Sequence, residues 1–235
     1  MLFFTKTCAY TVMGSGVLSR HTPHRQATTA LVLLLLAVGV VGCGRDADPQ
    51  ARGAKNTMSL DVDRALTDTS YTLVDQDSNA VTVPDDVLGM PVVLGTIYTN
   101  CPNICPQITA NMKDVRRQLE DPSSVQFVSV TFDPRRDTPA QLAAYQQRFG
   151  LDDTSWLFLT GDTATIGALM NRLDVRHTIK GTDRAFPRAS PDSAYVYNHS
   201  NQITLIDSQG RVRAEYAGSQ TPPSLIVDDL KKIHP

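Results

Sequence analysis

Between residues 92 and 173, apolar runs alternate with segments whose apolar residues recur at helical spacing. The run Val92–Ile97 has the composition of a strand buried on both faces of a sheet. A helical pattern follows, in which Ile108, Met112 and Val115 share one side. Repeated strand and helix patterns in this order predict βαβ units and a mainly parallel sheet.

The rest of the chain extends this pattern at both ends. The expected strands and helices, beyond those just named, are strands at 71–74, 80–83, 125–131, 156–160, 195–197, 202–206 and 212–216, and helices at 139–149, 163–173 and 223–233. Early βα units that are followed by an antiparallel hairpin and a last helix match the thioredoxin order. We therefore expect an α/β, thioredoxin-like fold, with a central mixed sheet flanked by helices and an N-terminal β-hairpin.

The N-terminal segment has the layout of a secretory signal. Arg20 and Arg25 precede an apolar run, Ala30–Val41, which is too short to span a bilayer unaided. Small residues around Cys43 resemble the lipobox of bacterial lipoproteins, which implies lipidation of Cys43 and an extracytoplasmic, membrane-anchored domain. An uncleaved N-terminal anchor is the alternative. The expected organisation is a signal peptide at 1–43, a flexible tether at 44–66 and one domain at 67–235.

The charge of the chain argues against nucleic acid as a partner. Its formal net charge is -2, and acidic and basic residues are interspersed along the sequence. A phosphate-binding surface needs a local excess of lysine and arginine, and the mature region contains no such run.

Cys101 and Cys105 are the only thiols of the expected domain, and they lie between the end of a buried strand and the start of a helix. Residues four apart on a helix have Cα atoms about 6 Å apart on one face, which suits a disulfide and also lets both sulfurs reach one metal ion. A helix N-terminus also stabilises a thiolate. The spacing therefore allows a redox pair, a metal site, or both at different times.

Four segments resemble motifs of the Sco/SenC family, copper-handling proteins associated with the assembly of cytochrome c oxidase. They are the cysteine motif Tyr98–Pro106, the segment Thr131–Pro139 with its Asp-Pro-x-x-Asp-Thr-Pro pattern, the strand Trp156–Gly161, and the histidine segment Asn198–Asp207. The resemblance runs from about Tyr71 to the C-terminus, with the same order and spacing.

The resemblance implies that Cys101, Cys105 and His199 bind copper, as Cu(I) or Cu(II), and that Asp133 is a neighbour of the site. Two thiolates and an imidazole suit Cu(I), whereas a structural zinc site would favour four protein ligands. The segment around Asp133 also has a purely structural explanation, because Thr138 can cap a helix that starts at Pro139.

The family resemblance implies two alternative functions for this site. The first is a copper metallochaperone, which receives copper from a donor protein and delivers it to the CuA site of cytochrome c oxidase subunit II. The second is a thiol-disulfide oxidoreductase, in which Cys101 and Cys105 form a redox-active pair that keeps the CuA-site cysteines reduced. A thiol peroxidase is disfavoured, since Tyr98 stands where those enzymes place a threonine. For His177 we expect a surface or packing role.

Overall fold

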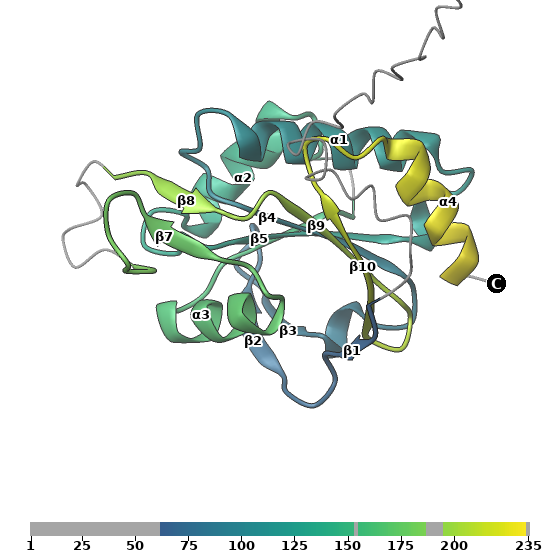
Figure 1. Ribbon diagram of the computed structural model, residues 1–235, viewed down its shortest axis with the longest axis horizontal. Coiled ribbons are helices and arrows are strands. Elements are labelled where there is room, and N and C mark those ends of the chain that lie inside the picture. Colours follow the sequence, from purple (N-terminus) through teal and green to yellow (C-terminus); the bar gives the residue numbers. More distant parts are fainter. Residues whose placement is uncertain (1–61, 153–154, 187–194, 234–235) are drawn as a thin grey trace, which may run out of the picture. The chain divides into compact units, whose positions relative to one another are not determined.

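The computed structural model of the protein describes residues 62–152, 155–186 and 195–233 (Figure 1). Its centre is a six-stranded sheet with the strand order β1-β10-β9-β4-β5-β6. These strands are β1 (Arg64–Ala65), β4 (Val92–Ile97), β5 (Gln126–Thr131), β6 (Leu157–Leu159), β9 (Gln202–Ile206) and β10 (Arg211–Ala217). Strands β4, β5 and β6 are parallel, whereas β9 runs antiparallel to β4, and β10 and β1 continue the antiparallel part. The sheet is therefore mixed, as expected.

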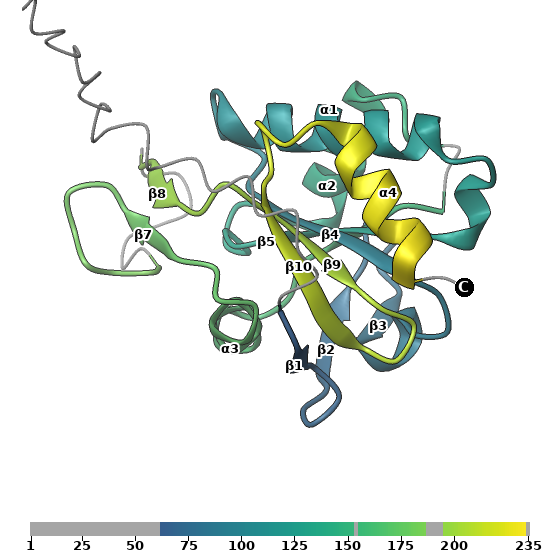
Figure 2. The same ribbon diagram turned by 45° about the vertical axis from the view of Figure 1, so that its right-hand side comes forward.

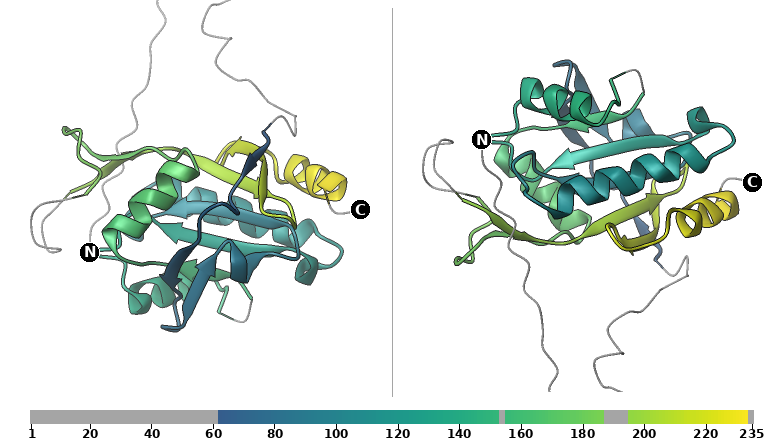
Figure 3. Two further views of the ribbon diagram at one scale, coloured as in Figure 1. Left: turned by 90° about the horizontal axis from the view of Figure 1, so that it is seen from below. Right: turned by 90° about the horizontal axis from the view of Figure 1, so that it is seen from above.

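Helices cover both faces of this sheet. The remaining elements, apart from one ribbon described below, are the helices α1 (Ile104–Gln118), α2 (Pro139–Arg148), α3 (Thr163–Arg172) and α4 (Pro223–Ile233), the hairpin strands β2 (Tyr71–Val74) and β3 (Ala80–Val83), and the short 3-10 helices Asp85–Val87 and Pro122–Ser124. Helices α1 and α4 lie on one face, and α3 lies with the β2–β3 hairpin on the other (Figures 1 and 3). This arrangement confirms the thioredoxin-like fold and the N-terminal hairpin.

The helix α1 packs on the central strand β4 through the apolar positions that the sequence pattern indicated. Ile108, Met112 and Val115 are fully buried, and every residue of β4 is buried. The contact is close at Gly95, where an added Cβ would lie 2.5 Å from the sulfur of Met112. Because α1 is fixed on β4 in this way, the start of α1 has a defined place at the end of the sheet.

A separate two-stranded ribbon consists of β7 (His177–Ile179) and β8 (Tyr197–His199). The two strands are antiparallel and pair with each other, with His177 opposite His199. The ribbon extends beyond the six-stranded sheet on the side away from α4 (Figure 2). The strand expected at 195–197 is thus shifted by two residues toward the C-terminus.

The folded domain begins earlier than the expected boundary at residue 67. Arg64 and Ala65, assigned to the tether, pair with β10, and Leu66 is only 2% exposed. This short edge strand has too few apolar residues to stand out in the sequence, and its pairing partner lies far along the chain. The proposed signal peptide, Cys43 and the first part of the tether lie outside the described residues. Within the described ranges, no helix is both long and apolar enough to cross a bilayer.

The turn that joins β9 and β10 generates a stability prediction. Gly210 has φ +78°, in the left-handed region, and an added Cβ would lie 2.7 Å from Cγ2 of Thr67. Gly181 has nearly the same φ, +80°, but open space around it. We expect Gly181→Ala to lower the free energy of unfolding by about 1 kcal/mol through backbone strain alone.

Gly210→Ala should lower it by about 2–4 kcal/mol, because overpacking against Thr67 adds to the same strain. Denaturant unfolding of both variants measures the two losses. Equal losses would show that the turn does not pack tightly against the segment that follows β1.

Candidate metal centre

The antiparallel pairing of β9 with β4 brings the cysteine and histidine segments together. Val92 pairs with Ile206 and Gly95 with Ile203, so the end of β4 lies beside the start of β9. The cysteine loop follows the end of β4, and His199 precedes the start of β9. Two segments that are 98 residues apart in sequence therefore meet at one edge of the sheet.

The two cysteines come from different local structures. Helix α1 begins at Ile104, so Cys105 lies in its first turn, whereas Cys101 lies in the preceding loop rather than one turn earlier on the same helix. The backbone N–H of Cys105 donates to Sγ of Cys101 at 3.3 Å. The sulfur thus occupies the position of a capping acceptor at a helix N-terminus, where partial positive charge stabilises an anion.

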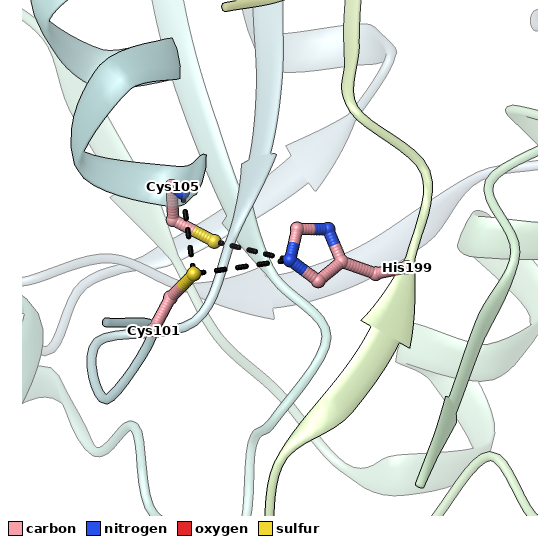
Figure 4. A group of neighbouring side chains, drawn as sticks. All are labelled: Cys101, Cys105 and His199. Atoms are coloured by element: carbon pink, nitrogen blue, oxygen red, sulfur yellow. Dashed lines mark hydrogen bonds between the residues drawn. The ribbon is translucent and has the colours of Figure 1, made fainter. Parts of the chain in front are cut away.

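The imidazole of His199 faces both sulfurs (Figure 4). Its Nε2 lies 3.8 Å from Sγ of Cys101 and 3.8 Å from Sγ of Cys105. Its Nδ1 lies 2.8 Å from the carbonyl oxygen of Ser200, a contact in which Nδ1–H donates when the ring is neutral. In the neutral ring this leaves the lone pair of Nε2 directed at the sulfurs, as a metal ligand needs, whereas in the protonated ring Nε2–H donates to the Cys101 thiolate instead.

These distances fit a single transition-metal ion. With bonds of about 2.3 Å to sulfur and about 2.0 Å to nitrogen, trigonal coordination separates sulfur from nitrogen by about 3.7 Å. The observed separations are 3.8 Å, and all three donor atoms lie within 4.8 Å of one another. Among the described residues, this is the one group of histidine, cysteine or carboxylate side chains close enough to hold a metal. Its soft donors suit Cu(I) or zinc better than magnesium or calcium.

The two thiols have opposite acidities. Hydrogen bonding from the Cys105 thiol, followed by the interaction with His199, lowers the pKa of Cys101 to about 3 despite its burial. Burial raises the pKa of Cys105, and the neighbouring Cys101 sulfur raises it further. Without metal, Cys101 is therefore the thiolate and Cys105 the thiol. One sulfur is ready to bind a metal or attack a disulfide, and the other must lose a proton first.

Aromatic rings line the site beside His199. The ring of Phe132 lies 5.0 Å from the imidazole, and that of Tyr98 lies 5.7 Å away in an edge-on arrangement. Tyr197 packs against both of these rings. Burial raises the pKa of Tyr98 to about 12, with a further contribution from the Cys101 charge. The hydroxyl therefore stays protonated, and the rings hold the imidazole in an apolar setting.

Asp133, expected as a neighbour of the site, is fully buried next to it. Its carboxylate pairs with Arg136 at 2.5 Å and accepts hydrogen bonds from the hydroxyls of Tyr195, at 2.6 Å, and Tyr197, at 3.3 Å. It is thus linked to the strand that carries His199. Its proposed role in the site remains a prediction.

Sequence reasoning missed Asp137, which holds the cysteine loop. Its carboxylate accepts from the backbone N–H of Thr99 at 3.0 Å, the Thr99 hydroxyl at 2.6 Å and the Thr131 hydroxyl at 2.5 Å. Burial raises the pKa of Asp137 to about 6, although these hydrogen bonds oppose the shift. The sequence feature that could have revealed Asp137 is its place in the Asp-Pro-x-x-Asp-Thr-Pro segment. The helix cap expected at Thr138 already explained that segment. That cap is present, with Thr138 accepting from the N–H of Gln141.

His177 has a packing role. It is buried, its ring lies 5.6 Å from that of Phe132 and 5.2 Å from that of Phe186, and burial lowers its pKa. It lies opposite His199 on the β7–β8 ribbon but is not one of the three clustered side chains.

Comparison with known proteins identifies relatives of this arrangement. The sequence model of the SCO1/SenC family matches residues 61–234. The SCO1 protein homolog of Bacillus subtilis is 27% identical over 163 residues, which cover 68% of this chain and 79% of that protein. The human mitochondrial SCO2 homolog is 31% identical over 63% of this chain, and this chain spans 52% of its length.

Solved structures agree with the sequence comparison. The copper-bound structure of Bradyrhizobium japonicum ScoI has 28% identity and a TM-score of 0.59, over 70% of this chain and 98% of that one. A SCO1/SenC family lipoprotein from Bacillus anthracis has the same identity and TM-score, over 74% of this chain and 96% of that one. The match of the family across the whole described fold, together with the cysteine–histidine geometry, shows that this chain belongs to the SCO1/SenC family.

Proposed function

We propose that the protein is a copper metallochaperone that binds one copper ion through Cys101, Cys105 and His199 and delivers it to the CuA site of cytochrome c oxidase subunit II. The observation that carries the proposal is the convergence of two sulfurs and an imidazole nitrogen within 4.8 Å. Soft thiolates and an imidazole form a donor set that suits Cu(I), and Cu(II) can be held when further ligands join. The copper-bound ScoI structure supports the choice of copper as cargo.

The arrangement suits a carrier better than a permanent site. Three protein donors leave room for a donor atom of a partner, and His199 is only partly buried. A thiolate of the receiving site could therefore join the ion before a ligand of this protein leaves. A copper donor protein could load the site by the same exchange in reverse.

A second candidate is a thiol-disulfide oxidoreductase that reduces oxidised cysteines of the CuA site. The unequal acidity of the two thiols favours it, because the Cys101 thiolate could attack a partner disulfide and release one partner thiolate. Cys105 would then lose its proton, attack the mixed disulfide and form the Cys101–Cys105 disulfide. The second partner sulfur leaves as a thiolate, so the partner gains the two electrons that the cysteine pair loses.

We further propose that the domain is extracytoplasmic and anchored to the membrane through lipidated Cys43. The apolar run before Cys43 and the small residues around it support this proposal. The related Bacillus anthracis protein is itself described as a lipoprotein.

The copper assignment predicts a large effect at His199 and a small one at His177. In the reduced, purified protein, His199→Ala should weaken copper binding by about 10- to 100-fold or more, because one of three ligands is lost. His177→Gln is the matched control, since His177 lies opposite on the same ribbon but outside the ligand cluster. Chelator competition with a Cu(I)-specific dye measures the affinity of each variant.

Unchanged affinity in His199→Ala would remove His199 from the ligand set. The same variant should still form the Cys101–Cys105 disulfide, as mass spectrometry after mild oxidation can show. This separates loss of copper binding from loss of the fold or of thiol chemistry.

The thiol asymmetry predicts a pH dependence in the reduced, metal-free protein. The pKa of Cys101 is lowered from 9.0 to about 3, so one thiolate should persist as the pH falls from 8 to about 4. Because the folded state favours this thiolate, the Cys101 contribution to stability should decrease as the pH falls through that window. Ultraviolet thiolate absorbance and pH-dependent unfolding measure both effects against Cys101→Ser. A thiolate signal that disappears between pH 9 and 7 would contradict the assignment.

The anchor proposal is tested by Cys43→Ser. We expect the wild-type protein in the membrane fraction of the producing cells, labelled by a fatty-acid analogue, and the variant without that label. A wild-type protein that takes up no lipid label would rule out the lipoprotein assignment and favour an uncleaved anchor.

A further inference from the structure

We infer that the loop Asp133–Asp137 braces the metal centre, because it holds the cysteine loop with one end and the histidine strand with the other. Within this brace, Arg136 and Tyr195 act as positioning residues for His199. The role in copper binding rests on the proposed function, whereas the contacts described below are present without copper.

The cysteine side of the brace is Asp137. Its carboxylate accepts both the backbone N–H and the hydroxyl of Thr99, two residues before Cys101. The third bond, from Thr131, fixes the same carboxylate to the end of β5. A fully buried carboxylate with three donors has one favourable position, so the cysteine loop is tied to the central sheet.

The histidine side of the brace is Arg136 with Tyr195. The guanidinium lies 3.6 Å from the centroid of the Tyr195 ring, and its Nη1 donates to the Tyr195 carbonyl oxygen at 3.2 Å. Its Nε pairs with Asp133 at 2.5 Å, and the Tyr195 hydroxyl donates to the same carboxylate. Tyr195 is therefore held by its ring, its hydroxyl and its backbone.

The strand geometry carries this constraint to His199. Side chains two residues apart on an extended strand point to the same face, so Tyr197 and His199 share one face of β8. Tyr195 lies before this strand, and its ring packs edge-on against that of Tyr197 at 5.6 Å. The ring contacts agree, because Tyr98 touches both Tyr197, at 5.2 Å, and His199, at 5.7 Å. Holding Tyr195 and Tyr197 against the loop therefore sets the place from which His199 reaches the sulfurs.

The ribbon that carries His199 needs such a support. Strand β8 pairs with β7 and is not a strand of the six-stranded sheet. A two-stranded ribbon is marginally stable alone, so its position depends on contacts with the rest of the fold. The contacts that cross from the loop to the segment before β8 are those of Arg136 and Asp133 with Tyr195. The Arg136–Asp133 pair fixes these two binding groups relative to each other, with side chains 12% and 0% exposed. A buried ion pair is expensive to separate and therefore favours one arrangement.

Tyr195→Leu tests the brace with little risk to the core, because Tyr195 is only partly buried and lies outside the sheet. We expect the metal-free variant to show about tenfold faster hydrogen exchange at residues 197–199, with exchange in α1 unchanged. Copper should be lost to a chelator about 10- to 100-fold more readily than from the wild type. Tyr195→Phe, which keeps the ring over Arg136, should show a smaller change in both measurements.

Two controls make the test specific. Val196→Ala changes an exposed neighbour on the same segment and should alter neither measurement. In a His199→Ala background, Tyr195→Leu should cause no further loss of copper, because the brace acts through His199. An equal loss in both backgrounds, or unchanged exchange at residues 197–199, would overturn the inference. A wild-type protein that binds no copper would refute the proposed function, while hydrogen exchange would still decide the brace.

Discussion

The pairing of β4 with β9 is the constraint from which the site follows. Because the strands are antiparallel, the residues after Ile97 and those before Gln202 lie at the same edge, whatever the length of chain between them. Any shift of this register by two residues would move His199 by about 7 Å along the strand, beyond the reach of the sulfurs. Strand pairing in a fully buried centre is strongly specified by its side chains, so the core of the domain fixes where the cysteine and histidine side chains meet.

The strand pairing does not distinguish Cys101 from Cys105. The position at which α1 begins gives the two sulfurs different environments. Cys101 lies before α1 and accepts from its first turn, whereas Cys105 belongs to that turn and is fully buried. The same four-residue spacing on a continuous helix would have placed both sulfurs in similar environments. Because the helix begins between them, one thiol is acidic and the other is not. The two thiols therefore have an order of reactivity, in which Cys101 reacts first because the thiolate is the nucleophile and the metal ligand.

Much of the fold could be predicted from sequence, since its helices and strands depend on local patterns, whereas Cys101, Cys105 and His199 were predicted as one group from the resemblance to Sco/SenC motifs. The helix predicted at 223–233 coincides with α4, and the apolar spacing of Ile108 and Met112 marked the buried side of α1. The edge strand at Arg64 and the role of Asp137 could not be predicted in this way. Each depends on a partner far along the chain, and neither a two-residue strand nor a single aspartate carries a periodic signal. Asp137 was also concealed by the cap at Thr138, which explained the segment without reference to the site.

The cysteine side and the histidine side of the site differ in how firmly they are attached to the core, which bears on the proposed capacity to hold and release an ion. The cysteine loop is bound to the central sheet through Asp137 and followed by a helix packed on β4. The histidine lies on a ribbon outside that sheet, and the side-chain contacts of Tyr195 and Tyr197 with the loop Asp133–Asp137 tie the start of β8 and the segment before it to the fold. Elements with few backbone bonds to the core open at lower free energy than the core itself. Because the imidazole has the weaker support, separation of His199 from the sulfurs costs less than separation of the two cysteines.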